Sequence, residues 1–165
     1  MSAVGWFRVD DRLIHGQVMV GWVLALDIPG IILANDRIAT DAWHQDTLRT
    51  VVTSFSEGVK LEMLRLSETV AYVENNRLKG RQMLLVESVS DAEALYRQGL
   101  SLPVLNLGGV HLRQGREKFL SFLYLDSSEI EAILRLSRKG INVIAQDLPG
   151  SRAVDVVKLI KRKRR

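Results

Sequence analysis

Residues 8–17 read Arg-Val-Asp-Asp-Arg-Leu-Ile-His-Gly-Gln, and this stretch is the most informative part of the chain. It gathers two arginines, two aspartates and a histidine within ten residues. A strand-like apolar run precedes it at 3–7, and a continuous apolar run follows at 18–26. A polar loop between a strand and a helix is a common ligand site in α/β proteins, because the free N–H groups and the dipole of the helix start favour an anion. The stretch therefore predicts an anion site on an α/β fold.

The composition is that of one globular domain. The chain has 165 residues, of which 47% are hydrophobic and 25% are charged, and it has no cysteine. The absence of cysteine excludes disulfides and thiolate metal sites. The first residues lack the basic head and apolar core of a signal peptide, and the run at 18–26 is shorter than the roughly 20 residues of a membrane span. We therefore expect a single cytoplasmic domain over residues 1–165.

The net charge of +4 comes from the C-terminus, because the last eight residues contain six basic side chains and the rest of the chain carries a net charge of −2. We expect a basic C-terminal helix or tail at about 154–165. A solvated helix end is the simpler interpretation, and contact with a membrane surface or nucleic acid is the alternative. Residues 158–165 contain no aromatic side chain, which argues against nucleic-acid binding.

Short apolar runs alternate with amphipathic stretches along the chain. Strands are expected at 3–9, 31–34, 59–64, 83–86, 104–107, 119–125 and 141–145. Helices are expected at 17–26, 40–52, 67–75, 91–97, 129–138 and 154–163. This alternation predicts an α/β fold with an open, doubly wound, mainly parallel sheet and helices on both faces. Right-handed crossovers then collect the strand carboxyl ends at one edge, which brings 10–15, 35–36 and 108–109 together.

Small polar residues and glycines mark the expected helix ends. Asn35 or Asp36 is expected to begin the helix at 40–52. Later caps are expected at Ser67, at Ser90, and at Ser127 or Ser128, while Gly99 and Gly140 end helices.

His15 is the candidate nucleophile. A neutral imidazole keeps a lone pair on one ring nitrogen near pH 7, and its attack on a phosphoryl group gives a phosphohistidine. Arg12 and Arg8 can offer charge-assisted hydrogen bonds to the phosphoryl oxygens. Asp10 or Asp11 can fix the imidazole tautomer.

Two further residues of the same loop suit an anion. Gly16 allows the backbone to approach the phosphoryl group closely, and Gln17 opens the following helix. Each of these residues also has an ordinary structural interpretation. A histidine or aspartate at a helix start is commonly a cap, and arginines beside aspartates commonly form salt bridges.

A wider pocket can be assembled from the other loops of the same edge. Its candidate residues are Asn35, Asp36, Gly108, Gly109 and His111. Residues 113–116 form either a second anion-binding wall or an ordinary turn with exposed arginines. We expect no metal, because no two histidines stand four apart. We expect no cofactor, because the chain has no Walker loop, GxGxxG fingerprint or GxSxG elbow.

The stretch from Arg8 to Val18, with Trp22 after it, resembles the phosphorylation-site signature of one protein family. This family is the enzyme IIB component of the mannose/fructose/sorbose family of the sugar phosphotransferase system. The resemblance extends over most of the chain, through Asn35–Asp36 with Ala39 and Asp41, Asn106–Gly109, Arg113–Arg116 and Tyr124–Asp126. The chain departs from the family at Val110, where methionine is common, at His111, and in its more basic C-terminus.

The resemblance implies an open α/β fold and a phosphotransferase with His15 as the phosphohistidine intermediate. His15 Nδ1 would accept the group from a histidine of a IIA protein, which is charged from phosphoenolpyruvate through enzyme I and HPr. It would pass the group to a sugar carried by membrane IIC and IID partners. Arg12 and Arg8 would hold the phosphate, while Asp10, Asp11 and Gln17 would shape the loop.

The sequence leaves other choices open. A regulatory phosphorelay protein without a sugar permease would need the same residues. The basic tail alone would support a nucleic-acid-binding module. The sequence names neither the sugar nor the oligomeric state, and the helix at 18–26 with Trp22 either packs in the core or takes part in a protein interface, as in a homo-oligomer.

Overall fold

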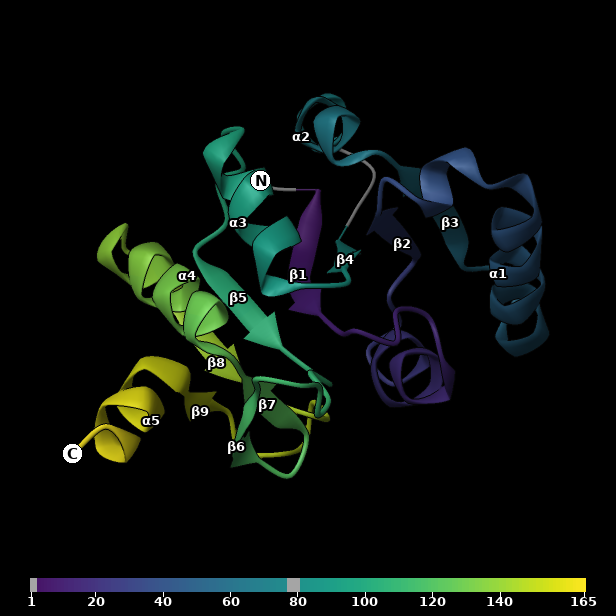
Figure 1. The fold of residues 1–165 in the computed structure, drawn as a ribbon. Coiled ribbons are helices and arrows are strands. Elements are labelled where there is room, and N and C mark those ends of the chain that lie inside the picture. The colour runs from purple at the N-terminus through teal and green to yellow at the C-terminus, as the bar shows by residue number, and fades with distance from the viewer. Residues whose placement is uncertain (1–2, 77–80) are drawn as a thin grey trace.

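The computed structural model describes residues 3–76 and 81–165, so Met1 and Ser2 of the N-terminal stretch lie outside it. The strands of the main sheet are β1 (Val4–Val9), β2 (Gly30–Ala34), β3 (Lys60–Leu64), β4 (Gln82–Val86), β5 (Val104–Leu107), β8 (Asn142–Ala145) and β9 (Val154–Asp155). Within the described residues they form one seven-stranded sheet in the order β3-β2-β4-β1-β5-β8-β9 (Figure 1). Its pairs are parallel except that β9 runs antiparallel to β8.

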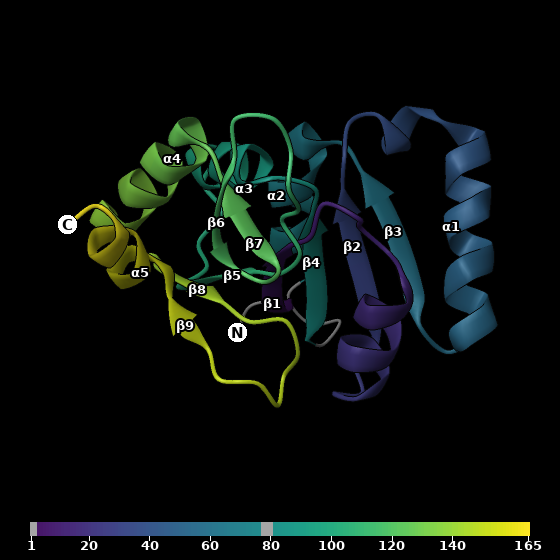
Figure 2. The same ribbon diagram turned by 60° about the horizontal axis from the view of Figure 1, so that its bottom comes forward.

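Helices cover both faces of this sheet. They are η1 (Gln17–Leu24), η2 (Ile38–Thr40), α1 (Ala42–Phe55), α2 (Leu66–Asn75), α3 (Val89–Arg97), α4 (Ser127–Arg138) and α5 (Val156–Lys163). Figures 1 and 2 show α2, α3 and α4 on one side of the sheet and η1 on the other, with α1 beyond β3. The predicted open, doubly wound α/β fold with a mainly parallel sheet is confirmed.

The alternation of side chains along the strands explains the two layers. Ile32 and Leu84 point into the core shared with α2, α3, α4 and α5, whereas Ile31 and Leu85 point into the core shared with η1 and α1. All four side chains are fully or almost fully buried. Strands of a parallel sheet are covered on both faces, which is why β2 and β4 read as continuous apolar runs.

The first helix differs from its prediction in type and length. An ordinary helix was expected at 17–26, but η1 is a π-helix that ends at Leu24. The Ile28 N–H reaches back five residues to the Val23 carbonyl at 2.8 Å. π-Helices are rare and occur preferentially at functional sites. Trp22 lies in the core, whereas Val20 remains exposed on the outer side of the helix.

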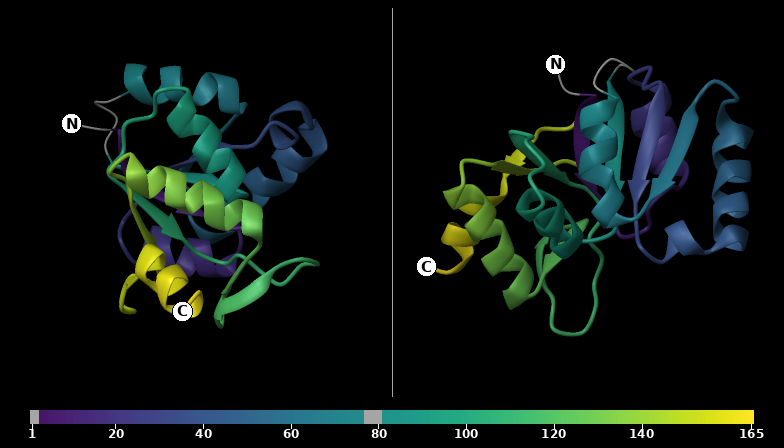
Figure 3. Two further views of the ribbon diagram at one scale, coloured as in Figure 1. Left: turned by 60° about the vertical axis from the view of Figure 1, so that its left-hand side comes forward. Right: turned by 90° about the horizontal axis from the view of Figure 1, so that it is seen from above.

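The prediction of one strand at 119–125 is wrong. Residues of this segment form β6 (Glu117–Leu120) and β7 (Leu123–Leu125), an antiparallel hairpin outside the main sheet. Figure 3 shows this hairpin standing apart from the seven-stranded sheet. The apolar run was predicted as one strand because the turn at Ser121–Phe122 contains neither glycine nor proline.

Several helix starts lie one to six residues from their expected caps. Asp41 caps α1, so the expected starts at Asn35 or Asp36 are wrong for that helix. Ser88 caps α3 in place of Ser90, and Asp126 caps α4 in place of Ser127 or Ser128. Ser67 lies inside α2, which begins after Arg65. In each case the residue that caps is the last one with an extended backbone, a feature that composition alone does not reveal.

The predicted C-terminal helix begins two residues later than expected, because Val154 and Asp155 form β9 and Asp155 caps α5. Gly99 and Gly140 follow helices in the left-handed conformation, with φ of 102° and 83°, as predicted. Among the described residues, no helix combines the length and apolar character that a membrane span requires.

Candidate functional site

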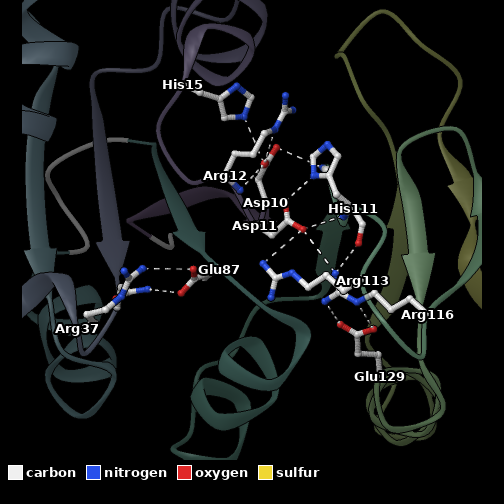
Figure 4. A network of polar contacts seen from close by, with 12 residues as sticks. Asp10, Asp11, Arg12, His15, Arg37, Glu87, His111, Arg113, Arg116 and Glu129 are labelled. Carbon is white, nitrogen blue, oxygen red and sulfur yellow. Dashed lines mark hydrogen bonds and ion pairs between the residues drawn. The ribbon is translucent and has the colours of Figure 1, made fainter. Parts of the chain in front are cut away.

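The site lies where the chain leaves β1 and β5. The loop after β1 leads to η1 on one face of the sheet, whereas the chain after β5 leads to α4 on the other face. A crevice opens at such a topological switch point, at the carboxyl ends of the strands. We call residues 10–16 and 108–116 the His15 loops. Figure 4 shows their polar side chains converging.

Asp10 is the centre of this cluster, and its carboxylate is fully buried. Oδ1 accepts a hydrogen bond from the Arg12 backbone N–H at 3.2 Å and lies 3.3 Å from His15 Nε2. Oδ2 accepts from the Gly109 backbone N–H at 3.3 Å and lies 3.6 Å from Arg8 Nη2. Asp10 therefore joins the two loops.

Burial on its own would raise the pKa of Asp10, but contacts with His15, Arg8 and the Arg12 backbone outweigh it and lower the pKa. The carboxylate is therefore ionised at neutral pH. A buried anion beside an imidazole orients the ring and stabilises positive charge on it.

His15 presents one nitrogen to Asp10 and the other to the start of η1. Its Nε2 is buried and lies close to Asp10 Oδ1, but without the alignment of a good hydrogen bond. Its Nδ1 accepts the Gln17 backbone N–H at 3.3 Å. A carboxylate can only accept, so Asp10 favours the tautomer with the proton on Nε2. The lone pair is then on Nδ1.

Arg12 lies beside this ring and is half-exposed, with 44% of its side chain accessible. Its Nη2 donates to Gln17 Oε1 at 2.8 Å, and its Nε lies 3.6 Å from Asp10 Oδ1. Gln17 thus holds the guanidinium next to the helix start. Gly16 has an ordinary helical backbone, and an added Cβ would meet nothing within 4 Å. The space beside Gly16 is open, but its conformation does not require glycine.

The loop is held in a strained turn. Leu13 has φ of 57°, a left-handed conformation that costs a branched side chain about 1–2 kcal/mol. Its side chain is buried in the core under η1, and its N–H donates to the Asp10 carbonyl at 3.0 Å. Burial of this leucine offsets the strain and fixes the turn between Asp10 and His15.

Arg8 is placed differently from its predicted role as a phosphate ligand. It is 99% buried, and its guanidinium donates to Asn106 Oδ1 and to the backbone carbonyls of Gln146 and Asp147 at 2.8–3.2 Å. It also stacks 4.5 Å from the centre of the Trp22 ring. Burial lowers the pKa of Arg8 to about 10. Arg8 therefore supports Asp10 from behind. Its Nη1 and Nη2 donate within the fold, whereas its buried Nε has no hydrogen-bond partner among the described residues.

Two glycines make room for these side chains. A Cβ on Gly108 would overlap the guanidinium of Arg8. A Cβ on Gly109 would stand 2.7 Å from His111 Cε1 and 3.2 Å from both Arg12 Nη2 and Asp10 Oδ1. The predicted pocket residues Gly108, Gly109 and His111 thus lie among the side chains of Arg8, Asp10 and Arg12.

Asp11 serves the second histidine rather than the first. Its carboxylate accepts the His111 backbone N–H at 2.7 Å and lies 2.6 Å from His111 Nδ1. Arg116 is buried behind this pair and forms a two-pronged bond with Glu129 at 2.6 and 3.1 Å. Arg116 is therefore neither part of an anion-binding wall nor an exposed arginine of a turn. Arg113 is exposed at the rim, 3.9 Å from Asp11.

Comparison with known proteins identifies the family. Residues 4–165 match the model described as "PTS system sorbose subfamily IIB component", where PTS is the phosphotransferase system. The chain belongs to the sorbose-subfamily IIB components of this system.

Individual relatives agree with this assignment. The sorbose-specific EIIB component of Klebsiella pneumoniae is 30% identical over 145 residues, covering 85% of this chain and 87% of the relative. The crystal structure of the IIBSor domain of the Klebsiella pneumoniae sorbose permease superposes with a TM-score of 0.85 at 27% identity, over 96% of each chain. The mannose-specific EIIAB component of Escherichia coli K12 is 31% identical over 141 residues, which are 85% of this chain but only 43% of that protein. The chain thus spans less than half the length of that relative.

In this IIB chain, the side chains of Asn35 and Asp36 form hydrogen bonds to neighbouring parts of the fold. Asn35 Oδ1 accepts the Ile38 N–H at 3.0 Å, and its Nδ2 donates to Glu87. Asp36 Oδ1 accepts the Leu66 N–H at 2.8 Å. β4 lies between β2 and β1, so this loop is displaced from His15 along the same sheet edge, as Figure 4 shows for the Arg37–Glu87 pair. The prediction that Asn35 and Asp36 line the same pocket is therefore not supported by their contacts.

Sequence reasoning missed several groups that position the site. Glu129 fixes Arg116, and the carbonyls of Gln146 and Asp147 hold Arg8. Backbone carbonyls leave no sequence signal. Glu129 could have been suspected, because it is an acid three residues after the Asp126 cap and within 13 residues of Arg116.

Proposed function

We propose that this IIB chain is a phosphocarrier in which His15 accepts a phosphoryl group from the phosphohistidine of a IIA protein and transfers it to a sugar. The orientation of His15 supports this proposal most directly, because buried Asp10 faces Nε2 and leaves the Nδ1 lone pair at the start of η1.

In the proposed step, His15 Nδ1 attacks the phosphorus of the IIA phosphohistidine. A new N–P bond forms at Nδ1, the N–P bond of the donor breaks, and its electron pair returns to the donor imidazole. The Nε2 proton stays on His15, where Asp10 offsets the positive charge that develops on the ring. A sugar hydroxyl oxygen then attacks the phosphorus and forms an O–P bond. The N–P bond to His15 breaks, its electron pair returns to Nδ1, and the hydroxyl proton passes to solvent.

The transferred group carries negative oxygens that need donors. The half-exposed guanidinium of Arg12, which Gln17 holds beside the start of η1, can supply such donors. The Gln17 N–H donates to Nδ1 in the free protein and loses this acceptor when the N–P bond forms. It can then donate to a phosphoryl oxygen at the start of η1. Arg8 acts through Asp10.

The proposal places residues 1–165 as a single IIB domain in the cytoplasm, between a soluble IIA donor and membrane IIC and IID partners that bring the sugar. In this proposal the His15 loops bind the phosphoryl group, and the permease selects the sugar. No cofactor takes part in this transfer.

The test uses phosphoenolpyruvate, enzyme I, HPr and a IIA protein of this family with the purified chain. We expect an acid-labile gain of one phosphoryl group on the wild type and none on His15→Ala, read by intact mass. His44→Ala is the matched control, since His44 also pairs with an aspartate, at 2.7 Å, but lies on α1. Phosphorylation of His15→Ala, or none of the wild type by a IIA that charges another IIB, would overturn the proposal. Sugar phosphorylation with added IIC and IID membranes then separates transport from a purely regulatory relay.

A further inference from the structure

His111 and Asp11 form a fixed pair beside His15 that the proposed transfer leaves without a role. Asp11 accepts the His111 backbone N–H at 2.7 Å and faces the ring Nδ1 at 2.6 Å. An ionised carboxylate only accepts hydrogen bonds, so the ring carries a proton on Nδ1. Nε2 is then the nitrogen that can bind a ligand. The ring is partly accessible, with 44% of the side chain exposed.

The surroundings hold this pair in place. Arg116 Nη1 donates to the His111 carbonyl at 2.7 Å and lies 3.6 Å from Asp11 Oδ2. The other side of the Arg116 guanidinium is bound by Glu129 of α4. The orientation of the His111 ring is therefore set by a chain of charged groups that ends in a helix. Such preorganisation is typical of a side chain that acts on a ligand.

The ring faces the phosphoryl site. His111 Cε1 is 2.7 Å from the position of a Cβ on Gly109, and Arg12 Nη2 is 3.2 Å from the same point. The same Nη2 is 2.8 Å from Gln17 Oε1, at the helix start where His15 Nδ1 lies. Figure 4 shows the Arg12 guanidinium between the two imidazole rings. Cε1 lies between the two ring nitrogens, so the Nδ1–Cε1–Nε2 edge is the part of the His111 ring that lies against Gly109, beside the Arg12 guanidinium.

We propose that His111 is a second ligand of the phosphoryl group, with its Nε2–H donating a hydrogen bond to a phosphoryl oxygen on His15. This rests on the proposed function of His15. A phosphoryl group brings up to about two negative charges, and Arg12 supplies one cation at the rim. When the group arrives, Nε2 takes a proton from solvent and His111 becomes an imidazolium; when the group leaves, the proton returns to solvent.

The charges around His111 are compatible with this role. Asp11 stabilises the imidazolium directly, and Asp10 lies across Gly109. Arg12 faces the ring from the first loop, while Arg113 and Arg116 flank Asp11 from the second. Glu129 neutralises Arg116 from α4. The free protein thus balances the cations with carboxylates, and the phosphoryl group supplies the additional negative charge that holds the proton on Nε2.

The test phosphorylates the 15N-labelled protein with phosphoramidate, a small donor that needs no IIA, slightly above neutral pH. The chain has three histidines, so each ring can be followed by its nitrogen frequencies. We expect His111 Nε2 to move from the frequency of an unprotonated to that of a protonated nitrogen when His15 is phosphorylated. The His44–Asp41 pair serves as the internal control and should not change.

The variant His111→Ala should accept the group from phosphoramidate about 10- to 100-fold more slowly, as expected for loss of a hydrogen bond to a charged group. His44→Ala should react at the wild-type rate. An unchanged His111 Nε2 frequency in protein that carries one phosphoryl group on His15 would overturn the inference but leave the proposed function standing. Failure of the wild type to gain any phosphoryl group would overturn both.

Discussion

Two polar regions at the same edge of the sheet have opposite uses. The His15 loops, after β1 and β5, bond mainly to each other, through pairs such as Asp11 with His111 that are 100 residues apart. The loop at 35–41 after β2, which we call the Asn35 loop, uses its side chains on the backbone of the elements that follow. Asn35 accepts the Ile38 N–H, Asp36 accepts the Leu66 N–H and Asp41 accepts the His44 N–H.

This difference separates a site from a set of caps. In the Asn35 loop, the oxygens named above satisfy the orphan N–H groups of helix starts, which is their ordinary role. In the His15 loops, Asp10 and Asp11 orient two imidazoles, so that the second ring nitrogen of each keeps its lone pair. The type of residue is the same in both loops, and only the identity of the partner shows the function.

Arginine replacement is expected to give the largest contrast between the loops. Arg12→Ala removes the half-exposed guanidinium next to His15 and should slow phosphoryl acceptance by about 100-fold or more, as for other lost charge-stabilising donors. Arg37→Ala removes a solvent-exposed partner of Glu87 and should leave the rate unchanged. The measurement is the initial rate of mass gain with a saturating phosphorylated IIA donor. Equal rates for the two variants would remove Arg12 from the mechanism.

The glycine that accommodates Arg8 should give the next largest effect, on stability. Gly108→Ala places a methyl group into the guanidinium of Arg8, which Asn106, the Gln146 carbonyl and the Trp22 ring hold in place. We expect a loss of about 2–3 kcal/mol in the free energy of unfolding, as for overpacking of a core. Gly150→Ala, where an added Cβ meets nothing within 4 Å, should change it by less than about 0.5 kcal/mol. Urea unfolding of both variants measures this, and equal stabilities would show that Arg8 has room to shift.

These effects also show what the sequence could and could not reveal. The alternation of apolar runs predicted the sheet, and the resemblance of residues 8–18 pointed to His15, because both signals are local. The burial of Arg8 could not be predicted, since its partners at 106 and 146–147 meet it only after folding. The hairpin of β6 and β7 was predicted as one strand, because its turn has no glycine or proline.

Asn35→Ala tests whether the Asn35 loop has a purely structural role. The change removes the acceptor of the buried Ile38 N–H and the donor to Glu87, so we expect a loss of about 1–2 kcal/mol in stability. Phosphoryl acceptance at a temperature where the variant is folded should equal that of the wild type. A slowed transfer in a fully folded variant would instead show that the Asn35 loop belongs to the site.

Asp10 of the His15 loops and Asp91 of α3, which is near Asp36 of the Asn35 loop, should titrate with opposite effects on stability. Contacts with His15 and Arg8 outweigh burial and lower the pKa of Asp10 in the folded protein. Ionised Asp10 therefore stabilises the fold above the ordinary aspartate pKa of about 3.9, and this stabilisation is lost as the pH falls through the pKa of the folded state. Burial, with Glu87 and Asp36 nearby, raises the pKa of Asp91 at the start of α3. Ionisation of Asp91 therefore lowers the stability of the fold as the pH rises through the pKa of the folded state, and acidification restores that stability.

Carboxyl carbon titration by NMR should place Asp10 below and Asp91 above ordinary aspartates. Asp91→Asn should remove the destabilisation that appears as the pH rises through the Asp91 transition. Midpoints in the reverse order would show that the charges of the His15 loops do not favour an ionised Asp10.

The smallest effect is expected from the basic C-terminus, which lies outside both the His15 loops and the Asn35 loop. Lys163 contacts Glu117 at 3.1 Å and also the Lys118 carbonyl, while Arg164 lies 3.6 Å from Glu131. These are surface contacts between α5, β6 and α4, and exposed ion pairs contribute up to about 1 kcal/mol each. Deleting residues 161–165 should therefore cost little stability and leave phosphoryl acceptance from both IIA and phosphoramidate unchanged. A variant that reacts normally with phosphoramidate but slowly with IIA would show that these cations dock the donor protein, because phosphoramidate tests the His15 loops alone.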